Sequence, residues 1–170
     1  MEQPSGAVHY SDQVLQNLAG KYLTFTLAGE EYGIAILKVK EIIGLVPITP
    51  VPKAPSFIKG VINLRGRVIP IMDLRLRFGM EPLDYNDRTC IIVVEANIGE
   101  SAGIMGLVVD SVSEVSNISA EEIQQTPTFG TQVDTDFILG MAKPEGKVKI
   151  LLDIDKVLSP EGMDKMEMPA

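Results

Sequence analysis

The sequence predicts a mainly all-β protein made of two similar lobes, and two observations carry this prediction. Short segments alternate apolar and polar residues between glycine- and proline-containing turns, a pattern typical of strands. The pattern of the stretch Phe57–Arg75 also returns about eighty residues later, in Phe137–Ile154. A pattern repeated within a chain of 170 residues favours two copies of one fold over a single large sheet.

The two copies share their framework and differ at one turn. The residues Phe57, Ile58, Gly60, Gly66, Val68 and Asp73 have identical counterparts at Phe137, Ile138, Gly140, Gly146, Val148 and Asp153. At a slightly smaller separation, Gly33, Ile34, Ile36, Val39, Glu41 and Ile42 match Gly106, Leu107, Val109, Val112, Glu114 and Val115. At the hairpin turn, Asn63, Leu64, Arg65 and Arg67 stand opposite Lys143, Pro144, Glu145 and Lys147. We expect the shared residues to build the lobes and the differing turn to carry a function.

The first lobe is predicted to begin with a hairpin after a polar tail over residues 1–20. Tyr22–Leu27 alternates aromatic or branched residues with threonines, a short glycine turn follows, and Glu31–Ile36 returns. Apolar residues then recur at three- and four-residue spacing, which predicts a short helix over Ile36–Gly44. Four prolines in Val46–Pro55 exclude a helix and a central strand, so this segment is expected to be extended.

The repeated hairpin follows, with strands predicted at Gly60–Leu64 and Val68–Met72. Asp73 is expected to cap a helical turn over Leu74–Phe78, because an aspartate carboxylate accepts hydrogen bonds from the first backbone N–H groups of a helix. The polar segment Glu81–Asp87 contains a proline and is the expected boundary between lobes. The lobes then cover about residues 21–85 and 86–158, with the chain crossing between them at its ends.

The second lobe repeats the β pattern and ends in a polar tail over residues 159–170. Ser119 followed by Glu122 predicts a capped helical turn, because this spacing lets each side chain bond the other's backbone N–H. The other predicted elements are strands at Cys90–Glu95, Ala102–Val109 and Ser111–Ile118, loops at Ala96–Ser101 and Thr126–Thr135, the second copy of the hairpin, and a helical turn at Asp153–Leu158.

Composition describes a folded soluble protein, with 45% hydrophobic and 22% charged residues. A formal charge of −8 argues against a general nucleic-acid binder, which needs a basic surface. The single cysteine, Cys90, excludes an internal disulfide, and its apolar surroundings favour a packed strand residue over a nucleophile. No signal-peptide pattern is visible, and no apolar run approaches the roughly 18 residues that a membrane span needs.

Residues suited to catalysis are sparse. The only histidine, His9, lies in the N-terminal tail, so neither a Ser-His or Cys-His dyad nor a three-histidine zinc site can be built around it. Asp84 and Asp87 either bracket a cation or form the ordinary turns of such residues beside proline. The glycines form no phosphate-binding motif. We therefore expect no enzymatic activity, no cofactor and no bound metal.

Recognition of other proteins is the function class that remains. Arg65 stands at the tip of the differing turn, and a guanidinium beside the apolar Leu64 is typical of interface hot spots. The alternative is a solvated turn arginine. Glu41 either joins this kind of contact or is a solvated charge at a helix end. Phe129, in a polar loop, either anchors a partner or packs into the core.

Four motifs closely resemble the family of bacterial chemotaxis coupling proteins, CheW: EEYGIAILKVKEI (Glu30–Ile42), FIKGVINLRGRVIPIMDLR (Phe57–Arg75), DYNDRT (Asp84–Thr89) and GLVVDSVSEVSNISAEEIQ (Gly106–Gln124). The resemblance covers nearly everything from Lys21 to Leu158. It implies two five-stranded SH3-like β-barrels packed on each other, with a few short helices. It also implies a cytoplasmic adaptor without enzymatic activity, which links the tips of methyl-accepting chemotaxis receptors to the histidine kinase CheA. Such an adaptor is recruited to receptor arrays at the inner face of the cell membrane and assembles into rings with the kinase.

The resemblance also implies two contact surfaces. By their places in the motifs, the residues expected to bind the receptor are Val39, Glu41, Gly60, Asn63 and Arg65. A helical receptor tip would dock in the groove between the lobes. Gln124 and Phe129 are expected to contact the regulatory domain of the kinase. Gln124 stands where some relatives carry a basic residue, which leaves open whether a charge pair forms there.

Three alternatives differ from this prediction. A CheW-like coupling protein of another receptor–kinase pathway, such as motility or development, would share the same motifs. A coupling protein with an attached receiver domain is disfavoured, because only about a dozen residues follow Leu158 and a domain needs roughly 100. A hydrolase or metal enzyme would need a cluster of titratable groups in a pocket.

Overall fold

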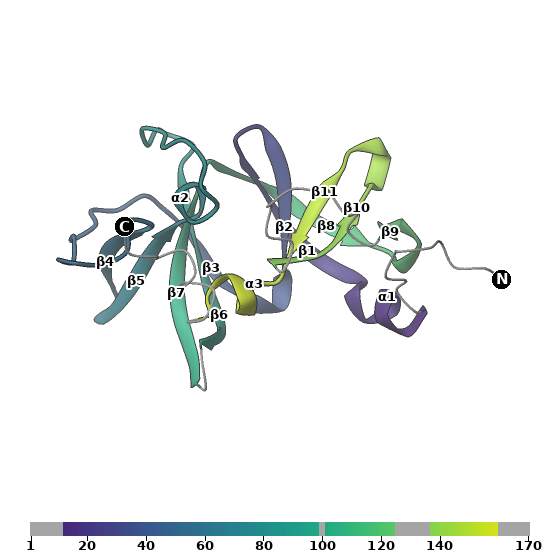
Figure 1. The fold of residues 1–170 in the computed structure, drawn as a ribbon, viewed down its shortest axis with the longest axis horizontal. Coiled ribbons are helices and arrows are strands. Elements are labelled where there is room, and N and C mark those ends of the chain that lie inside the picture. Colours follow the sequence, from purple (N-terminus) through teal and green to yellow (C-terminus); the bar gives the residue numbers. More distant parts are fainter. Residues whose placement is uncertain (1–11, 99–100, 125–136, 160–170) are drawn as a thin grey trace.

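The computed structural model describes residues 12–98, 101–124 and 137–159, whose strands form two sheets packed against each other (Figure 1). The six-stranded sheet has the order β8 (Ser111–Ile118), β1 (Gly20–Leu27), β2 (Glu30–Ala35), β11 (Lys149–Leu152), β10 (Ile138–Ala142), β9 (Ile123–Gln124). The five-stranded sheet has the order β3 (Val39–Gly44), β6 (Cys90–Ile98), β7 (Ser101–Val109), β5 (Arg67–Asp73), β4 (Ile58–Leu64). The helical elements are α1 (Asp12–Leu18), α2 (Leu74–Arg77), α3 (Ile154–Val157), and the single 3₁₀ turns η1 (Ile36–Lys38), η2 (Ala120–Glu122) and η4 (Pro144–Gly146). The predicted mainly all-β, two-lobed fold is confirmed, with β9 as a short additional strand.

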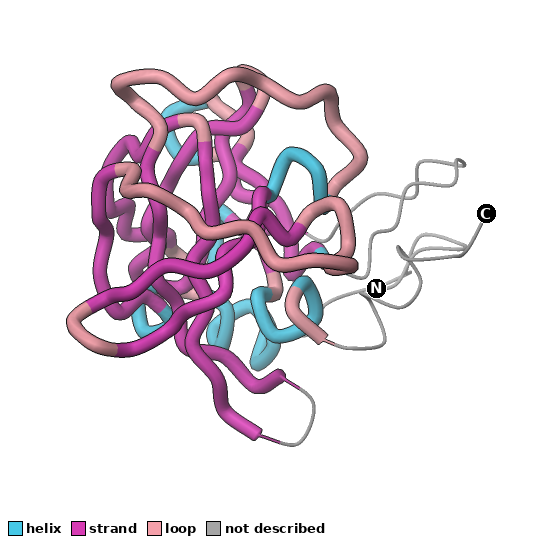
Figure 2. The backbone as a smooth tube through the Cα atoms, turned by 90° about the vertical axis from the view of Figure 1, so that its left-hand side faces the viewer, coloured by secondary structure: helices cyan, strands magenta, loops and turns pink. Residues whose placement is uncertain are grey.

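The five-stranded sheet closes on itself. Its edges in hydrogen-bonding order are β3 and β4, yet the segment after β3 returns to β4, where Thr49 and Val61 exchange two backbone hydrogen bonds of 2.9 Å. Gly60 makes this approach possible, because it has a φ of +143° and a Cβ atom there would overlap the Thr49 carbonyl oxygen. Closure leaves fewer unpaired strand edges. In the view of Figure 2, turned toward this sheet, the strands run around the molecule instead of forming one flat layer.

The two copies of the hairpin have the same local structure. The N–H of Asp73 donates to the carbonyl of Phe57 at 2.8 Å, and the N–H of Asp153 donates to the carbonyl of Phe137 at 2.7 Å. Each aspartate carboxylate also accepts a hydrogen bond, at 3.3 Å, from the backbone N–H three residues later. The predicted cap at Asp73 and the predicted helical turn after Asp153 are confirmed.

The strands of the two sequence copies are interleaved between the sheets. β1 and β2 of the first copy pair with β8 and β11 of the second, and β6 and β7 of the second pair with β3 and β5 of the first. The chain therefore changes sheet after residues 35 and 109, whereas the expected lobe boundary lies between residues 85 and 86. Each change of sheet is made over a short connection, the three residues of η1 after β2 and Asp110 alone after β7.

The predicted helix over Ile36–Gly44 is wrong. Only Ile36–Lys38 is helical, as a 3₁₀ turn, and the rest is β3, which pairs with β6. A bulge interrupts the pairing between Val39 and Glu41 and shifts the alternation by one residue. The three-residue spacing from Ile36 to Val39 crosses η1, and the four-residue spacing from Val39 to Ile43 spans the bulge, so together they imitate a helical period.

Two predicted loops have different outcomes. The loop over Ala96–Ser101 is mostly strand, because β6 continues through residue 98 and β7 starts at residue 101. The loop over Thr126–Thr135 lies outside the described residues.

Apolar side chains from both sheets meet in one main core. Among its buried members are Leu23, Phe25, Leu27 and Ile34 of the six-stranded sheet and Met72, Ile92, Val94 and Leu107 of the five-stranded sheet. Each sheet also has a smaller apolar cluster of its own. The main core holds the sheets together by burial of apolar surface, which has no preferred direction.

Arg77 is the largest fully buried side chain, and it lies where the two copies of the hairpin meet. Its guanidinium carbon is 5.2 Å from the ring centroid of Phe57 and 4.5 Å from that of Phe137. Its Nε–H donates to the carbonyl of Val157 at 3.2 Å. These cation–π and hydrogen-bonding contacts offset the cost of burying the charge.

Candidate functional site

The turn between β4 and β5 is where the two sequence copies differ. Leu64 pairs with Arg67, so the turn contains only Arg65 and Gly66, at φ angles of 51° and 87°. Positive φ at both positions is typical of the turns that suit the twist of a two-residue hairpin. The Gly66 N–H donates to the Asn63 side-chain oxygen at 2.8 Å. Asn63 and Gly66 thus shape the turn, and Arg65 is held at its tip in a conformation uncommon for a non-glycine residue.

Arg65 reaches across the sheet seam to Glu41. Its Nη2 forms a hydrogen-bonded ion pair with Glu41 Oε1. Glu41 lies on β3, the edge strand opposite β4 in hydrogen-bonding order, so the pair spans the line along which the sheet closes. The side chain of Arg65 is 69% exposed and that of Glu41 is 31% exposed. An ion pair so exposed contributes less than about 1 kcal/mol to stability, so both charges can interact with a partner at little cost.

Exposed apolar side chains occur on the same strands. Val39 is half-buried and packs against the main core, whereas Ile42 is 43% exposed and Val68, beside the turn, is 72% exposed. Val39 and Ile42 lie on the face of β3 toward the main core and Glu41 lies on the other face, so this edge strand carries both charged and branched apolar side chains. Such a combination is suited to binding another protein. We call the set Val39, Glu41, Ile42, Arg65 and Val68 the seam surface.

The structure gives different roles to the five residues expected to bind a receptor. Val39 is half-buried and packs against the main core. Glu41 and Arg65 contact each other directly. Asn63 is exposed but serves the turn that presents Arg65. Gly60 is buried beneath Thr49, where its lack of a side chain lets the sheet close. Sequence patterns alone identify these positions together and cannot separate direct contacts from supporting roles.

The residues expected to contact a kinase lie away from the seam surface or outside the described residues. Gln124 ends β9, at the edge of the six-stranded sheet, and is exposed. Phe129 lies within residues 125–136, outside the described part of the chain. The turn before β9 has the predicted capping box, in which the Ser119 N–H donates to the Glu122 carboxylate at 2.9 Å.

A recess of about 470 Å³ beside the proline-rich segment was not predicted. Its lining includes Leu45, Val46, Ile48, Ile58, Lys59 and Tyr85. The Lys59 ammonium lies 5.8 Å from the centroid of the Tyr85 ring, whose hydroxyl donates to Asp73 at 2.8 Å. Burial, and then this hydrogen bond, raise the pKa of Tyr85. The available sequence signal was the alternation of prolines with apolar residues, which leaves side chains such as Val46 without a neighbouring strand.

Within the described ranges, no group of three or more histidine, cysteine, aspartate or glutamate residues is arranged to hold a metal ion. His9 lies outside those ranges. Cys90 is half-buried at the start of β6, and its thiol donates to the carbonyl of Arg88 at 3.3 Å. The helices of the described chain are all too short or too polar to cross a membrane.

Comparison with known proteins agrees with this arrangement. The family model described as the CheW-like domain matches residues 21–161. The chain is 42% identical over 148 residues to the chemotaxis protein CheW of Klebsiella aerogenes, covering 87% of each protein. It is 35% identical to the CheW of Rhizobium meliloti, covering 86% of this chain and 92% of the relative.

A solved structure is similar as well. The crystal structure of the scaffolding protein TtCheW from Thermoanaerobacter tengcongensis matches with a TM-score of 0.72 and 38% identity, over 82% of this chain and 92% of that one. The family model and the two curated relatives each cover most of the chain. The chain therefore belongs to the CheW-like domain family and is an adaptor protein of bacterial chemotaxis.

Proposed function

We propose that this protein links chemotaxis receptors to the histidine kinase CheA, as a non-enzymatic adaptor in the cytoplasm that is recruited to receptor arrays. The observation that carries the proposal is the Glu41–Arg65 pair, because it presents two charges at an exposed seam beside branched apolar side chains. The family membership and the description of TtCheW as a scaffolding protein support it.

The seam surface suits a helical partner such as a receptor tip. A docked helix presents apolar anchors at three- and four-residue spacing, and a few fixed charges set its position along a groove. Val39, Ile42 and Val68 supply the apolar side, and Arg65 supplies a planar donor for a carboxylate of the helix. Because Glu41 already orients Arg65, less conformational freedom is lost on binding.

The kinase would bind elsewhere on the molecule. Gln124 at the β9 edge and Phe129 in the following segment form one proposed contact. The recess between the proline-rich segment and Tyr85 offers a second apolar surface, on the other sheet. Contacts on both sheets would allow one adaptor to touch two kinase regulatory domains, which is the requirement for a ring.

The receptor assignment is tested by Arg65→Glu, with Arg67→Glu as the matched control. Both residues belong to the same exposed hairpin and undergo the same change of charge. We expect Arg65→Glu to weaken binding of a receptor-tip fragment about tenfold, equivalent to about 1.4 kcal/mol, in titration calorimetry. Arg67→Glu should change it little, and kinase binding should persist in both. Equal losses in the two variants would show a general charge effect and contradict the assignment.

The kinase assignment is tested by Phe129→Ala, which should weaken binding of the CheA regulatory domain more than binding of the receptor tip. Thermal unfolding identifies the alternative, since a large loss of stability would show that Phe129 belongs to the core. Co-sedimentation of receptor membranes, kinase and this protein then tests the whole proposal. Kinase recruitment that does not require the protein would disprove coupling.

A second candidate is coupling in another receptor–kinase pathway. One relative, 26% identical over 140 residues, is named Protein FrzA, of Myxococcus xanthus, and its name does not refer to chemotaxis. Binding to receptors of one pathway and not another, measured with purified tip fragments, distinguishes the two candidates.

A further inference from the structure

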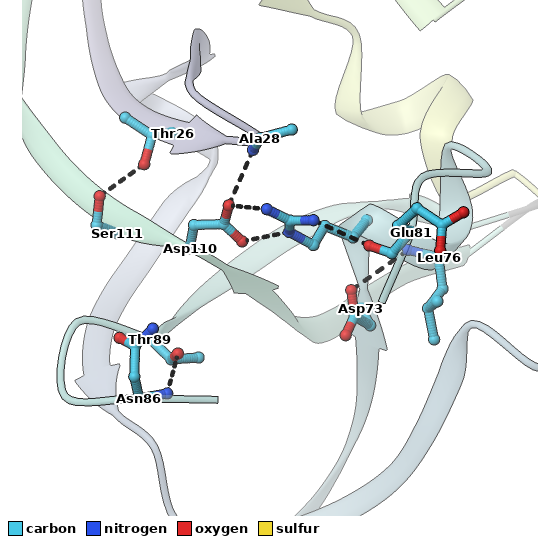
Figure 3. Close-up of polar contacts among 10 residues, drawn as sticks. Thr26, Ala28, Asp73, Leu76, Glu81, Asn86, Thr89, Asp110 and Ser111 are labelled. Atoms are coloured by element: carbon cyan, nitrogen blue, oxygen red, sulfur yellow. Dashed lines mark hydrogen bonds and ion pairs between the residues drawn. The ribbon is translucent and has the colours of Figure 1, made fainter. Parts of the chain in front are cut away.

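A half-buried carboxylate ties the two sheets together where the chain crosses from one to the other. Asp110 is the single residue between β7 of the five-stranded sheet and β8 of the six-stranded sheet. It accepts hydrogen bonds from Arg75 Nε at 2.8 Å and Nη2 at 2.7 Å, and from the Ala28 N–H at 2.9 Å. Arg75 belongs to α2, after β5, and Ala28 belongs to the β1–β2 turn. Figure 3 shows the Asp110 carboxylate with its hydrogen bond to the Ala28 N–H.

A second carboxylate ties the sheets at the other crossing. Asp155 lies on α3, which follows β11 of the six-stranded sheet. Both of its oxygens lie 3.1 Å from Lys38 Nζ, and Lys38 belongs to η1, where the chain passes from β2 to β3. Asp155 also accepts the Asn97 N–H at 3.0 Å, near the end of β6. Asp155, which follows a strand of the six-stranded sheet, is thus bonded both to the crossing segment η1 and to the five-stranded sheet.

The two junctions lie at corresponding places in the two copies and have opposite polarity. The alignment that superposes Phe57 on Phe137 and Asp73 on Asp153 places Arg75 opposite Asp155. In one junction the helix carries the cation and the crossing carries the anion, and in the other junction these charges are exchanged. The crossing residues are neighbours in the alignment and not equivalent, because Asp110 stands opposite Leu37 and Lys38 opposite Ser111. Each junction fixes a crossing segment to both sheets.

The junctions differ in strength. The Arg75 and Asp110 side chains are 14% and 20% exposed, and a guanidinium binds a carboxylate through two parallel hydrogen bonds. Burial opposes ionisation of Asp110, but the hydrogen bonds from Arg75 and Ala28 outweigh it and lower the pKa of this carboxyl. The Lys38 and Asp155 side chains are 36% and 34% exposed, and an ammonium is a point charge without a fixed fork. Salt and water therefore weaken the second junction more.

We propose that these two junctions set the angle between the sheets, and that the Lys38–Asp155 junction is the adjustable one. Lys38 directly precedes Val39, the first residue of β3, so opening this junction moves the seam surface relative to the six-stranded sheet. The Arg75–Asp110 junction acts as the fixed pivot. A partner that binds the seam surface would thereby change the position of the β9 edge, a shear of packed layers about a polar contact.

The experiment measures the distance between the sheets in the full chain without any partner. Spin labels are placed at Val68→Cys on β5 and Val115→Cys on β8, both exposed, in a Cys90→Ser background. Lys38→Met should broaden and shift the distance distribution. The matched control is Lys40→Met, two residues later, whose 3.7 Å contact with Glu95 joins β3 to β6 within one sheet. The Lys40→Met variant should leave the distance distribution unchanged. In the labelled protein that keeps Lys38, molar salt should reproduce the effect of Lys38→Met.

A charge exchange separates orientation from simple loss of stability. The double variant Lys38→Asp with Asp155→Lys recreates the polarity of the other junction and should restore the narrow distribution at least in part. An unchanged distribution in Lys38→Met, or equal broadening in Lys40→Met, would overturn the proposal.

The consequence for binding rests on the proposed function and is measured separately. If the sheets carry a signal between partners, a bound receptor tip should change kinase affinity about fivefold, the lower end of usual couplings, and Lys38→Met should abolish this change. If Lys38→Met alters the distances between the spin labels but not the effect of the receptor tip on kinase affinity, the junction sets the angle between the sheets but has no role in signalling. Unchanged distances between the labels would refute the proposal that this junction sets the angle between the sheets, whatever the binding measurements show.

Discussion

Equivalent glutamates in the two sheets form ion pairs of different kinds. Glu41 on β3 and Glu114 on β8 are equivalent in the alignment of the two sequence copies. Glu41 pairs with Arg65, whose side chain is 69% exposed at a turn tip, whereas Glu114 contacts Lys149 Nζ at 3.5 Å, and that side chain is only 6% exposed. Lys149 also binds Glu31 at 3.1 Å and Ser116 at 3.2 Å. Equivalent glutamates thus belong to an accessible ion pair in the five-stranded sheet and contact a largely buried cation in the six-stranded sheet.

The difference follows from where each cation is attached. Lys149 occupies the place that Ile69 has in the other copy, and Ile69 is buried in the cluster inside the five-stranded sheet. The six-stranded sheet therefore contains a lysine where its counterpart has an apolar side chain, and surrounding acceptors satisfy this charge. The five-stranded sheet places its cation outside, on the turn. Equivalent positions have therefore acquired a structural role in one sheet and a recognition role in the other.

The strongest test of this comparison is Lys149→Ala. It leaves Glu31, whose side chain is 23% exposed, without its buried partner, and we expect a cost of about 3 kcal/mol, the lower end for a buried ion pair broken from one side. Urea denaturation should show a loss of this size, and Lys149→Met should lose less, because it fills the volume with an apolar chain. A loss below about 1 kcal/mol in Lys149→Ala would mean that Lys149 is no more structural than Arg65.

A second test compares two equivalent glycines. Gly106 lies opposite Ile71, and Gly33 lies opposite Leu151, at the parallel strand pairs of the two sheets. A Cβ at Gly106 would lie 2.6 Å from Ile71 Cδ1 and 2.8 Å from Ile91 Cγ2, whereas at Gly33 the nearest atom, Leu151 Cδ2, would be 3.1 Å away. Gly106→Ala should cost about 1–3 kcal/mol from overpacking, and Gly33→Ala less. The reverse order in thermal unfolding would contradict the difference in packing.

Acid titration tests the fixed junction. Because Asp110 has a pKa lowered by Arg75 and the Ala28 N–H, its contribution is present above its unfolded pKa, about 3.9, and is lost as pH falls through the lower folded value. At pH 7, Asp110→Asn should lose about 2 kcal/mol, the range for hydrogen bonds to charged groups. The difference between variant and parent should shrink below about pH 4. A constant difference across that range would exclude ionisation of Asp110 as the cause.

The smallest effect on stability is expected for Arg65→Glu. Turn-tip substitutions away from packed features usually change stability by less than about 0.5 kcal/mol, and the repulsion from Glu41 adds little in an exposed setting. Circular dichroism melting should therefore leave the unfolding temperature nearly unchanged while receptor binding falls. A loss approaching that of Lys149→Ala would show that the exposed pair is also structural.

Local sequence features predicted the local structure well. The hairpin at Phe57–Arg75, the cap at Asp73 and the capping box at Ser119 are each set by residues within a few positions of one another. The prediction failed at Ile36–Gly44, where a 3₁₀ turn precedes a bulged strand and the partner strand β6 lies far along the chain. For the same reason Glu41 was expected at a helix end and not on a strand that faces Arg65.

The sequence by itself determined that the protein has two similar β units with one specialised turn, because a repeat is visible residue by residue. Only the tertiary structure decided that the strands of the two copies are exchanged, that Arg65 meets Glu41, and that Asp110 and Asp155 tie the sheets together. Patterns report which face of a strand is buried, but they do not report which strand lies beside it. Here the chain changes sheet at η1 and at Asp110, and the partners that β3 and β8 then meet, β6 and β1, lie far away in the sequence.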